Sequence, residues 1–370
     1  MKTMKTIKVN AIKLAAAFLG MAGATAFGAD SNWIGAINND FNTAGNWDTN
    51  AVPSNAYRYV ISSPGASVTT SADAQVLGMV VSATGAGSIL TITHNLNTPN
   101  NNYGNNQIWV GTNPNNSSGV GGYTGTITQT SGTFNGIQIL NVGAGSNYGG
   151  GPTPADQGNL NFGSATSSGA PVLGVSDTLF VGGRYNENGV LSLSGYGTFT
   201  TNNLNQSIYY GNSTFSVTGG NLSINVGSLK LDQYNAGFES TNLNATIDAT
   251  GFSTINASSV FLGRAATLNV SLGNGFTPTT GTVYHIISCP NAFTGYYSGF
   301  FKNVAEGGFI SAGNIRFLAS YNGGVGGHDL TLTAMPRVGA DTNWTGSINN
   351  DLPRQQNLCE QGGSGSFARA

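Results

Sequence analysis

Hydrophobic and polar residues alternate along most of the chain after residue 30. Leu191 and Leu193 flank a serine, and Phe215 and Val217 flank another. In an extended strand this alternation puts the apolar side chains on one face and the hydroxyl side chains on the other. Long stretches lack the helical spacing of apolar residues, and Gly and Asn separate the β-branched segments. The pattern therefore predicts an all-β protein.

A mostly apolar triplet followed by glycine recurs along the chain. Its copies are Ile108–Gly111, Leu140–Gly143, Leu179–Gly182, Ile208–Gly211 and Val260–Gly263. The strand–turn–strand segments between the copies cannot each bury an apolar face, so neighbouring units must stack. We therefore predict a right-handed parallel β-solenoid (β-helix) over residues 60–275, in which the triplets end equivalent strands. A β-sandwich is the alternative, because its strands also recur at short intervals.

The regions on either side of these repeats have their own patterns. Trp33, the pair Asn46-Trp47 and the pair Val52-Pro53 mark a separate cassette over residues 30–59. We predict that this cassette is a cap, because the terminal coil of a solenoid must be covered to stay soluble. Residues 276–336 are predicted to form a closing β module.

The start of the cassette returns near the end of the chain. Gly339–Asp351 matches Gly28–Asp40 at ten of thirteen positions, which chance does not explain. Leu352–Ala370 then lacks both the Asn-Trp pair and any strand pattern. We interpret residues 337–370 as a truncated second copy followed by an aberrant, disordered tail.

These motifs resemble those of a known group of surface proteins. The Trp33 to Pro53 cassette, the glycine-ended triplets and the stretch from Tyr284 to Thr333 are similar to autotransporter-like passenger proteins with type V secretion/PEP-CTERM-associated repeats. The resemblance covers most of residues 30–336. It implies a β-helical passenger that is displayed on, or released from, a Gram-negative-type envelope. Neither a translocator barrel nor a Pro-Glu-Pro sorting signal follows in this sequence.

The first 29 residues are predicted to be a Sec-type signal peptide. Lys2, Lys5, Lys8 and Lys13 precede the small, apolar stretch 15–27, and small residues follow at the expected cleavage positions. The stretch is shorter than the roughly 18 apolar residues that span a membrane, and the rest of the sequence has no such run. We therefore expect a secreted or outer-surface protein without a membrane span in the mature chain.

Composition narrows the classes of partner. Only 8% of residues are charged, and glycine occupies 55 of 370 positions. Without the four lysines of the predicted signal peptide, the chain has nine basic and fifteen acidic residues. The sequence has no basic stripe, so nucleic acid is not an expected partner. Two cysteines, Cys289 and Cys359, cannot form a disulfide framework, and Cys289 is expected to be a buried thiol.

Candidate catalytic groups are few and widely spaced. A β-helical lyase would need clustered acids and a basic residue on one face. The candidates are Arg184, Glu187, Lys230, Asp232, Asp248 and Arg264, and they occupy unmatched places in the repeat. The histidines, His94, His285 and His328, have no partner at zinc-ligand spacing. We therefore predict no catalytic residue, metal site or cofactor.

Tryptophan is the remaining candidate for ligand binding. Trp33, Trp47 and Trp109 could stack on sugar rings if they were exposed, since indoles have wide apolar faces. For Trp33 and Trp47 we favour packing in the cap. The sequence thus predicts a bacterial cell-surface protein with a structural or adhesive, non-catalytic role, whose partners would be extracellular polysaccharide or other surface proteins. A carbohydrate-active β-helix, either a binder or a lyase, is the alternative.

Overall fold

The computed structural model describes residues 29–99, 106–112, 121–144, 155–183, 187–207, 211–232 and 240–336. The predicted signal peptide up to residue 28, the second copy and the tail after residue 336 lie outside these ranges. Within the ranges, strands dominate, and the two 3-10 turns, η1 (Ala44–Asn46) and η2 (Tyr296–Ser298), are the only helices. Neither turn has the length to cross a membrane.

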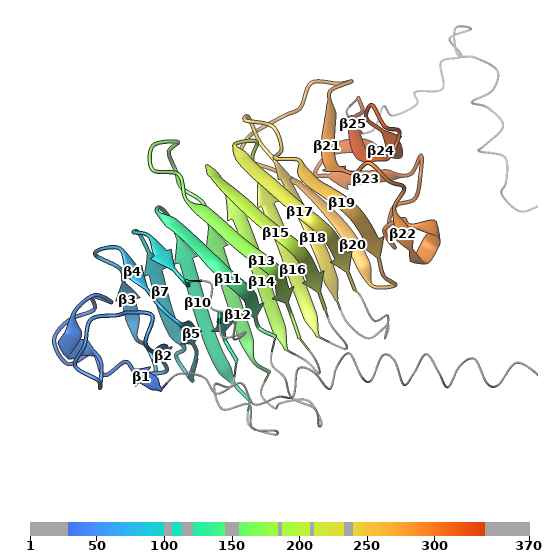
Figure 1. The fold of residues 1–370 in the computed structure, drawn as a ribbon. Coiled ribbons are helices and arrows are strands. Elements are labelled where there is room, and N and C mark those ends of the chain that lie inside the picture. Colours follow the sequence, from blue (N-terminus) through green and yellow to red (C-terminus); the bar gives the residue numbers. More distant parts are fainter. Residues whose placement is uncertain are drawn as a thin grey trace, which may run out of the picture.

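Two long sheets, built from parallel strands in their central part, make up the body of the molecule (Figure 1). The large sheet has sixteen strands, and the small sheet has nine. The large sheet contains β1 (Asp30–Asn32), β2 (Arg58–Ile61), β4 (Ala74–Gln75), β5 (Gly78–Val81), β8 (Leu96–Asn97), β9 (Gln107–Val110), β11 (Thr133–Val142), β13 (Val172–Val181), β15 (Gly197–Gln206), β17 (Leu222–Leu231), β19 (Ile255–Leu262), β21 (Val283–Ser288), β22 (Thr294–Gly295), β23 (Phe309–Ala312), β24 (Ile315–Gly323) and β25 (Asp329–Ala334). The small sheet contains β3 (Ser67–Thr69), β6 (Ala83–Thr84), β7 (Ser88–Ile92), β10 (Tyr123–Gln129), β12 (Gln157–Phe162), β14 (Asn188–Ser194), β16 (Asn212–Thr218), β18 (Thr241–Ile247) and β20 (Ala266–Leu272).

The chain alternates between the two sheets, so each turn of the chain adds one strand to each. Strands β10 and β12 pair in parallel, as do β11 and β13, and the same holds coil after coil up to β18 with β20 and β17 with β19. This is the predicted β-solenoid. The sandwich alternative is excluded, because its sheets are built from antiparallel strands.

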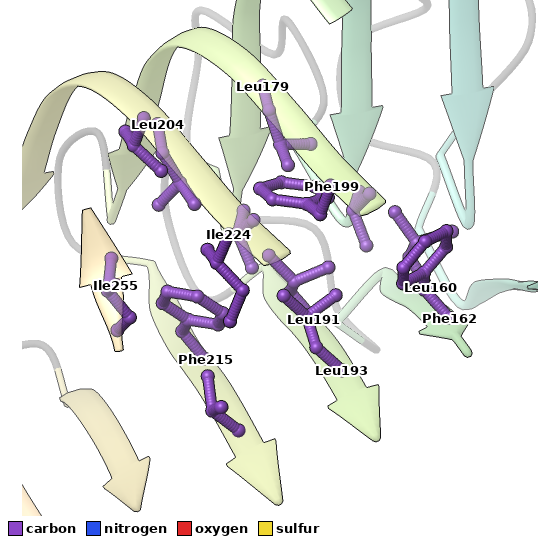
Figure 2. Close-up of a cluster of buried hydrophobic side chains, with 14 of the residues drawn as sticks. Leu160, Phe162, Leu179, Leu191, Leu193, Phe199, Leu204, Phe215, Ile224 and Ile255 are labelled. Atoms are coloured by element: carbon purple, nitrogen blue, oxygen red, sulfur yellow. The ribbon is translucent and has the colours of Figure 1, made fainter. Parts of the chain in front are cut away.

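The core lies between the sheets and is continuous along the stack. Inward residues of both sheets, such as Phe199 in β15 and Phe215 in β16, are fully buried and belong to one cluster (Figure 2). Alternation explains the cluster, because every second side chain of each strand points inward. Burial of apolar surface stabilises each coil only when the next coil covers it, which couples neighbouring repeats.

The predicted equivalence holds for four of the five triplets, because Val110, Val142, Val181 and Leu262 lie in one register. After Val181, the next residue in that register is Gln206, not Tyr210. Residues 208–210 lie outside the described ranges. The next equivalent position is Leu231, which is followed by Asp232 and therefore does not end a glycine-ended triplet.

The corner after these strands explains the missed copies. The chain takes a positive φ at Gly111, Gly143 and Gly182, and then at Ser207 and Asp232. Glycine adopts this conformation freely, while other residues adopt it at some cost. A corner therefore need not contain glycine, and a motif defined by glycine loses register where serine or aspartate takes its place.

The two ends of the solenoid differ from its coils. At one end β1 pairs in parallel with β2, so the cassette contributes the first strand of the large sheet. At the other end β21 continues the sheet beside β19, while β23, β24 and β25 add antiparallel pairs (Figure 1). The closing β module thus changes strand direction where the coils stop.

Candidate functional site

The cap buries two of the three tryptophans considered for ligand binding. Trp47 is 1% exposed and Trp33 is 6% exposed. The Trp47 ring makes edge-on contacts with Trp33, Phe41 and Tyr59 at centroid distances of 5.1, 5.2 and 4.8 Å. Its Nε1 donates a hydrogen bond of 2.8 Å to the carbonyl of Phe41. Such rings have no face left for a sugar, so Trp33 and Trp47 are structural here, and glycan stacking at these two positions is corrected to cap packing.

Asn46 explains why the cassette pairs asparagine with tryptophan. Its side chain is fully buried, and its Oδ1 accepts hydrogen bonds from the backbone N–H groups of Ile37 and Asn38 at 2.9 and 3.1 Å. Its Nδ2 donates to the Asn38 side chain and to the carbonyl of Asp40. Asn46 therefore pairs with backbone N–H and carbonyl groups of residues 37–40. Trp47 packs against Phe41, which follows this loop. Burial of an amide is tolerated when its hydrogen bonds are made in this way.

The acidic lyase candidates are buried or bonded to the backbone at turns. Glu187 and Asp232 are fully buried, and Asp232 Oδ2 accepts a hydrogen bond of 2.7 Å from the backbone N–H of Ala265. Asp248 lies in the turn after β18, where its Oδ1 accepts from the backbone N–H and the hydroxyl of Thr250. These carboxylates stabilise corners and turns.

Two of the basic candidates, Lys230 and Arg264, lie near the corner that holds Asp232. Lys230 points outward from β17, while the Arg264 guanidinium lies 5.1 Å from the centre of the Tyr296 ring after β19. Arg184 is outside the described ranges. Glu187 and Asp232 are fully buried, so neither carboxylate is presented on the surface beside these bases. The described residues also contain no group of three or more His, Cys, Asp or Glu that could hold a metal ion.

The histidines and the described cysteine have structural surroundings. His94 Nδ1 lies 3.1 Å from the carbonyl of Thr70, next to the small sheet. His285 Nδ1 lies 3.1 Å from Asp329 Oδ2, and the other oxygen of Asp329 accepts from the backbone N–H of Cys289. Cys289 is a buried free thiol, as expected. Asp329 thereby joins β25 to the end of β21 within the closing module.

A shallow groove, lined about equally by polar and apolar surface, lies where the large sheet bends, and we call it the bend groove. It has a volume of about 330 Å³ and crosses β15, β17 and β19. Its polar rim includes Thr200, Asn202, Asn225, Asn256 and Ser258, and Val226 and Ala257 contribute apolar surface. Thr200, Asn225 and Asn256 are in register on adjacent strands, so the groove runs along the solenoid axis.

The amide nitrogens of three asparagines in the bend groove all donate to protein groups. Asn202 Nδ2 donates to the carbonyl of Ser176, and Asn256 Nδ2 donates to the carbonyl of Ile224 at 3.1 Å. Asn225 Nδ2 donates to the hydroxyl of Ser223 at 3.3 Å. The amide nitrogens are thus held by the protein, and the amide oxygens remain as acceptors. An uncharged groove lined by acceptors and hydroxyls suits a ligand with hydroxyl donors, which is the chemistry of a neutral sugar.

The sequence did not point to this groove. Its residues are single Asn, Ser and Thr side chains of ordinary strands, and they meet only because the strands pair. Thr200, Asn225 and Asn256 are brought side by side by the parallel pairing of β15 with β17 and of β17 with β19.

The outer face of the small sheet carries mainly amide and hydroxyl side chains. None of its nine strands contains a charged residue. One row of outward side chains, which we call the amide–hydroxyl row, is in register along the stack: Thr91, Thr128, Asn161, Ser192, Ser216, Asn244 and Asn269. Asn244 Nδ2 donates to Ser216 at 3.2 Å, and Asn269 Nδ2 donates to Asn244 at 2.9 Å. The row forms an uncharged face of amides and hydroxyls.

Comparison with known proteins gives no relative. The chain matches no family model, no curated protein and no solved structure.

Proposed function

We propose that this protein is a non-catalytic, structural or adhesive β-solenoid that is exported to a bacterial cell surface. The observation that carries the proposal is the uncharged outer face of the small sheet, with its amide–hydroxyl row. Contact through such a face uses hydrogen bonds and close packing, and it does not depend on long-range charge. The burial of the candidate acids Glu187 and Asp232 supports a non-catalytic role, and the predicted signal peptide supports export.

The test is adhesion of the purified full chain to an uncharged, hydroxyl-rich surface, such as a dextran-coated sensor. We expect the adhered amount to change little between about 0.1 M and 1 M salt, although the Debye length falls from about 10 to 3 Å over this range. A negatively charged surface serves as the comparison. Adhesion that is lost at high salt, or that occurs only on the charged surface, would contradict the proposal.

The alternative function, binding of a carbohydrate, is favoured by the bend groove. Its volume of about 330 Å³ lies at the lower end of the range for small-molecule sites, and its rim offers amide oxygens and hydroxyls. This function is compatible with adhesion, because an adhesive protein can hold polysaccharide at one site and pack through another. Asn225→Leu would remove one acceptor from the groove, and we expect it to weaken binding of a neutral oligosaccharide there.

A further inference from the structure

One row of outward side chains on the large sheet differs from all the others. Adjacent strands place these residues in register, next to the corner where the chain leaves the sheet. We call the row the aromatic row: Trp109, Asn141, Phe180, Asn205, Lys230 and Phe261. Large apolar rings and amides thus follow one another along the solenoid axis.

The three rings point away from the core. Trp109, Phe180 and Phe261 alternate with core residues such as Val110 and Val181, which are fully buried. The rings themselves are partly exposed and are not packed against the core cluster. They lie two and three strands apart along the row. Their burial therefore contributes little to the core, and their presence on the outer face calls for another reason.

The two asparagines of the row are unusual for a surface position. Asn141 is 6% exposed and Asn205 is 7% exposed, although both side chains point outward from the sheet. Asn141 Nδ2 and Asn205 Oδ1 make no hydrogen bond. Covered polar atoms without a partner are uncommon in folded proteins. Both amides flank Phe180, but these two atoms have almost no accessible surface, so a ligand resting on that ring contacts the rings and not these atoms.

We infer that the aromatic row binds an extended, uncharged polysaccharide that lies along the solenoid axis. Sugar rings present apolar C–H faces that pack on partly exposed aromatic rings. Neighbouring strands are about 4.8 Å apart, so Trp109 and Phe180 are separated by about 10 Å and Phe180 and Phe261 by about 14 Å. This spacing suits a polymer with close to one sugar unit per strand.

The composition of the row decides between ligand classes. It contains no carboxylate, and Lys230 is its one charged residue, so an acidic polysaccharide would find a single cation. A protein strand would pair with a free sheet edge, whereas the row lies on a sheet face. The inference rests on the proposed adhesive role and names the class of material that is held.

The experiment uses the full-length protein with hydroxyethyl cellulose, a soluble, uncharged β-linked glucan, in affinity electrophoresis and titration calorimetry. We expect Trp109→Ala, Phe180→Ala and Phe261→Ala each to weaken binding about tenfold, equivalent to about 1.4 kcal/mol. Phe180→Tyr should retain binding, because the ring remains. Val190→Ala, a partly exposed apolar residue of the small sheet, is the matched control and should bind like the parent.

A second readout follows from the positions of the tryptophans. Because Trp33 and Trp47 are buried and Trp109 is partly exposed, the glucan should protect part of the indole fluorescence from acrylamide. The protection should disappear in Trp109→Ala. Lys230→Gln should leave glucan binding unchanged, whereas a large loss would indicate that charge dominates and overturn the choice of ligand class.

The outcomes separate this inference from the proposed function. If the parent protein adheres to the uncharged surface but does not bind the glucan, or if the ring variants bind it like the parent, the inference is wrong and the adhesive role stands. If the parent binds the glucan through the rings but shows no salt-independent adhesion, the inference stands and the adhesive role is wrong.

Discussion

The outer faces of the two sheets differ, although the inner faces are alike. Both inner faces bury leucine, valine, isoleucine and phenylalanine in one continuous cluster. Outward, the small sheet repeats amides and hydroxyls without charge, whereas the large sheet bends, forms the bend groove and carries the aromatic row. Inward positions are thus apolar in both sheets, because they hold the coils together. Of the two outer faces, the one of the large sheet is the more varied in composition. We therefore place the proposed specific binding on the large sheet and the proposed general contact on the small one.

The largest expected effect distinguishes inward from outward positions on one strand of the small sheet. Phe215 is fully buried and its neighbour Thr214 points outward. Phe215→Ala should lower the free energy of unfolding by about 3–5 kcal/mol, because the cavity cannot close between neighbouring coils. Thr214→Ala should change it by no more than about 0.5 kcal/mol. Urea unfolding of both variants measures this, and similar losses would mean that the outer face also carries the fold.

The second prediction concerns the corner between the sheets. Gly143 has φ of +58°, and a Cβ there would lie 1.9 Å from the carbonyl oxygen of Asn188. Gly143→Ala should destabilise the protein by about 3 kcal/mol or more, from backbone strain and a backbone clash together. Gly169 has φ of +70° with open space around it, so Gly169→Ala isolates the strain, which we expect to cost about 1 kcal/mol. Equal losses in thermal unfolding would show that the close approach is relieved cheaply.

The third prediction concerns the groups with shifted pKa values, which lie outside the small sheet and should determine how stability depends on pH. Burial raises the pKa of the Tyr321 hydroxyl in β24, although the backbone N–H of Phe301 donates a hydrogen bond to it. The folded state therefore holds this proton more tightly than the unfolded state does. Its contribution to stability is complete below the unfolded pKa of about 10 and is lost as pH rises above it. The unfolding free energy of Tyr321→Phe should therefore fall less steeply than that of the parent as pH rises above about 10. Urea unfolding at a series of pH values measures this difference.

Other groups with shifted pKa values also lie outside the strands of the small sheet. Burial raises the pKa of Tyr59 in β2 and of Tyr284 in β21. For Asp40 of the cap, burial acts to raise the pKa, but hydrogen bonds from Ser71, Asn42 and Thr43 outweigh it and lower the pKa. A pH dependence that responds to substitutions in the small sheet would contradict this division.

The smallest expected effect is a charge placed on the amide–hydroxyl row. Asn161 and Ser192 are neighbours on β12 and β14, so Asn161→Lys with Ser192→Lys puts two like charges side by side. We expect a loss of about 0.5–1 kcal/mol at low salt that largely disappears at high salt. Ser192→Lys alone should be close to neutral. A large, salt-independent loss would indicate that the uncharged face is required for folding as well as for contact.

The sequence predicted the stack but not the surface. Alternation around Phe215 and the triplets that end at Val110 and Val142 identified parallel coils, because burial imposes a strict period on inward residues. The cap was likewise predictable from Trp33 and Trp47. The register positions at Gln206 and Leu231 were not, because Ser207 and Asp232 adopt the corner conformation without glycine.

The outward site could be found only in part. Trp109 was a candidate from its residue type, and its neighbours along the chain place it outward. Phe180 and Phe261 join it only through the pairing of strands that lie tens of residues apart, which a single sequence does not encode in readable form. The bend groove depends on the pairing of β15, β17 and β19, which brings together residues that lie far apart in the chain.

The corner that follows the large sheet has a consequence for how this chain can change over time. Residues 143–156 connect the sheets in one coil and residues 207–211 do so in another, yet the strands on both sides stay in register. The lattice of coils therefore fixes where a connection must leave and return but sets no length for it. Insertions and deletions in these connections therefore need not disturb the packing of the core. We expect this edge to tolerate sequence variation and to accept an inserted foreign peptide.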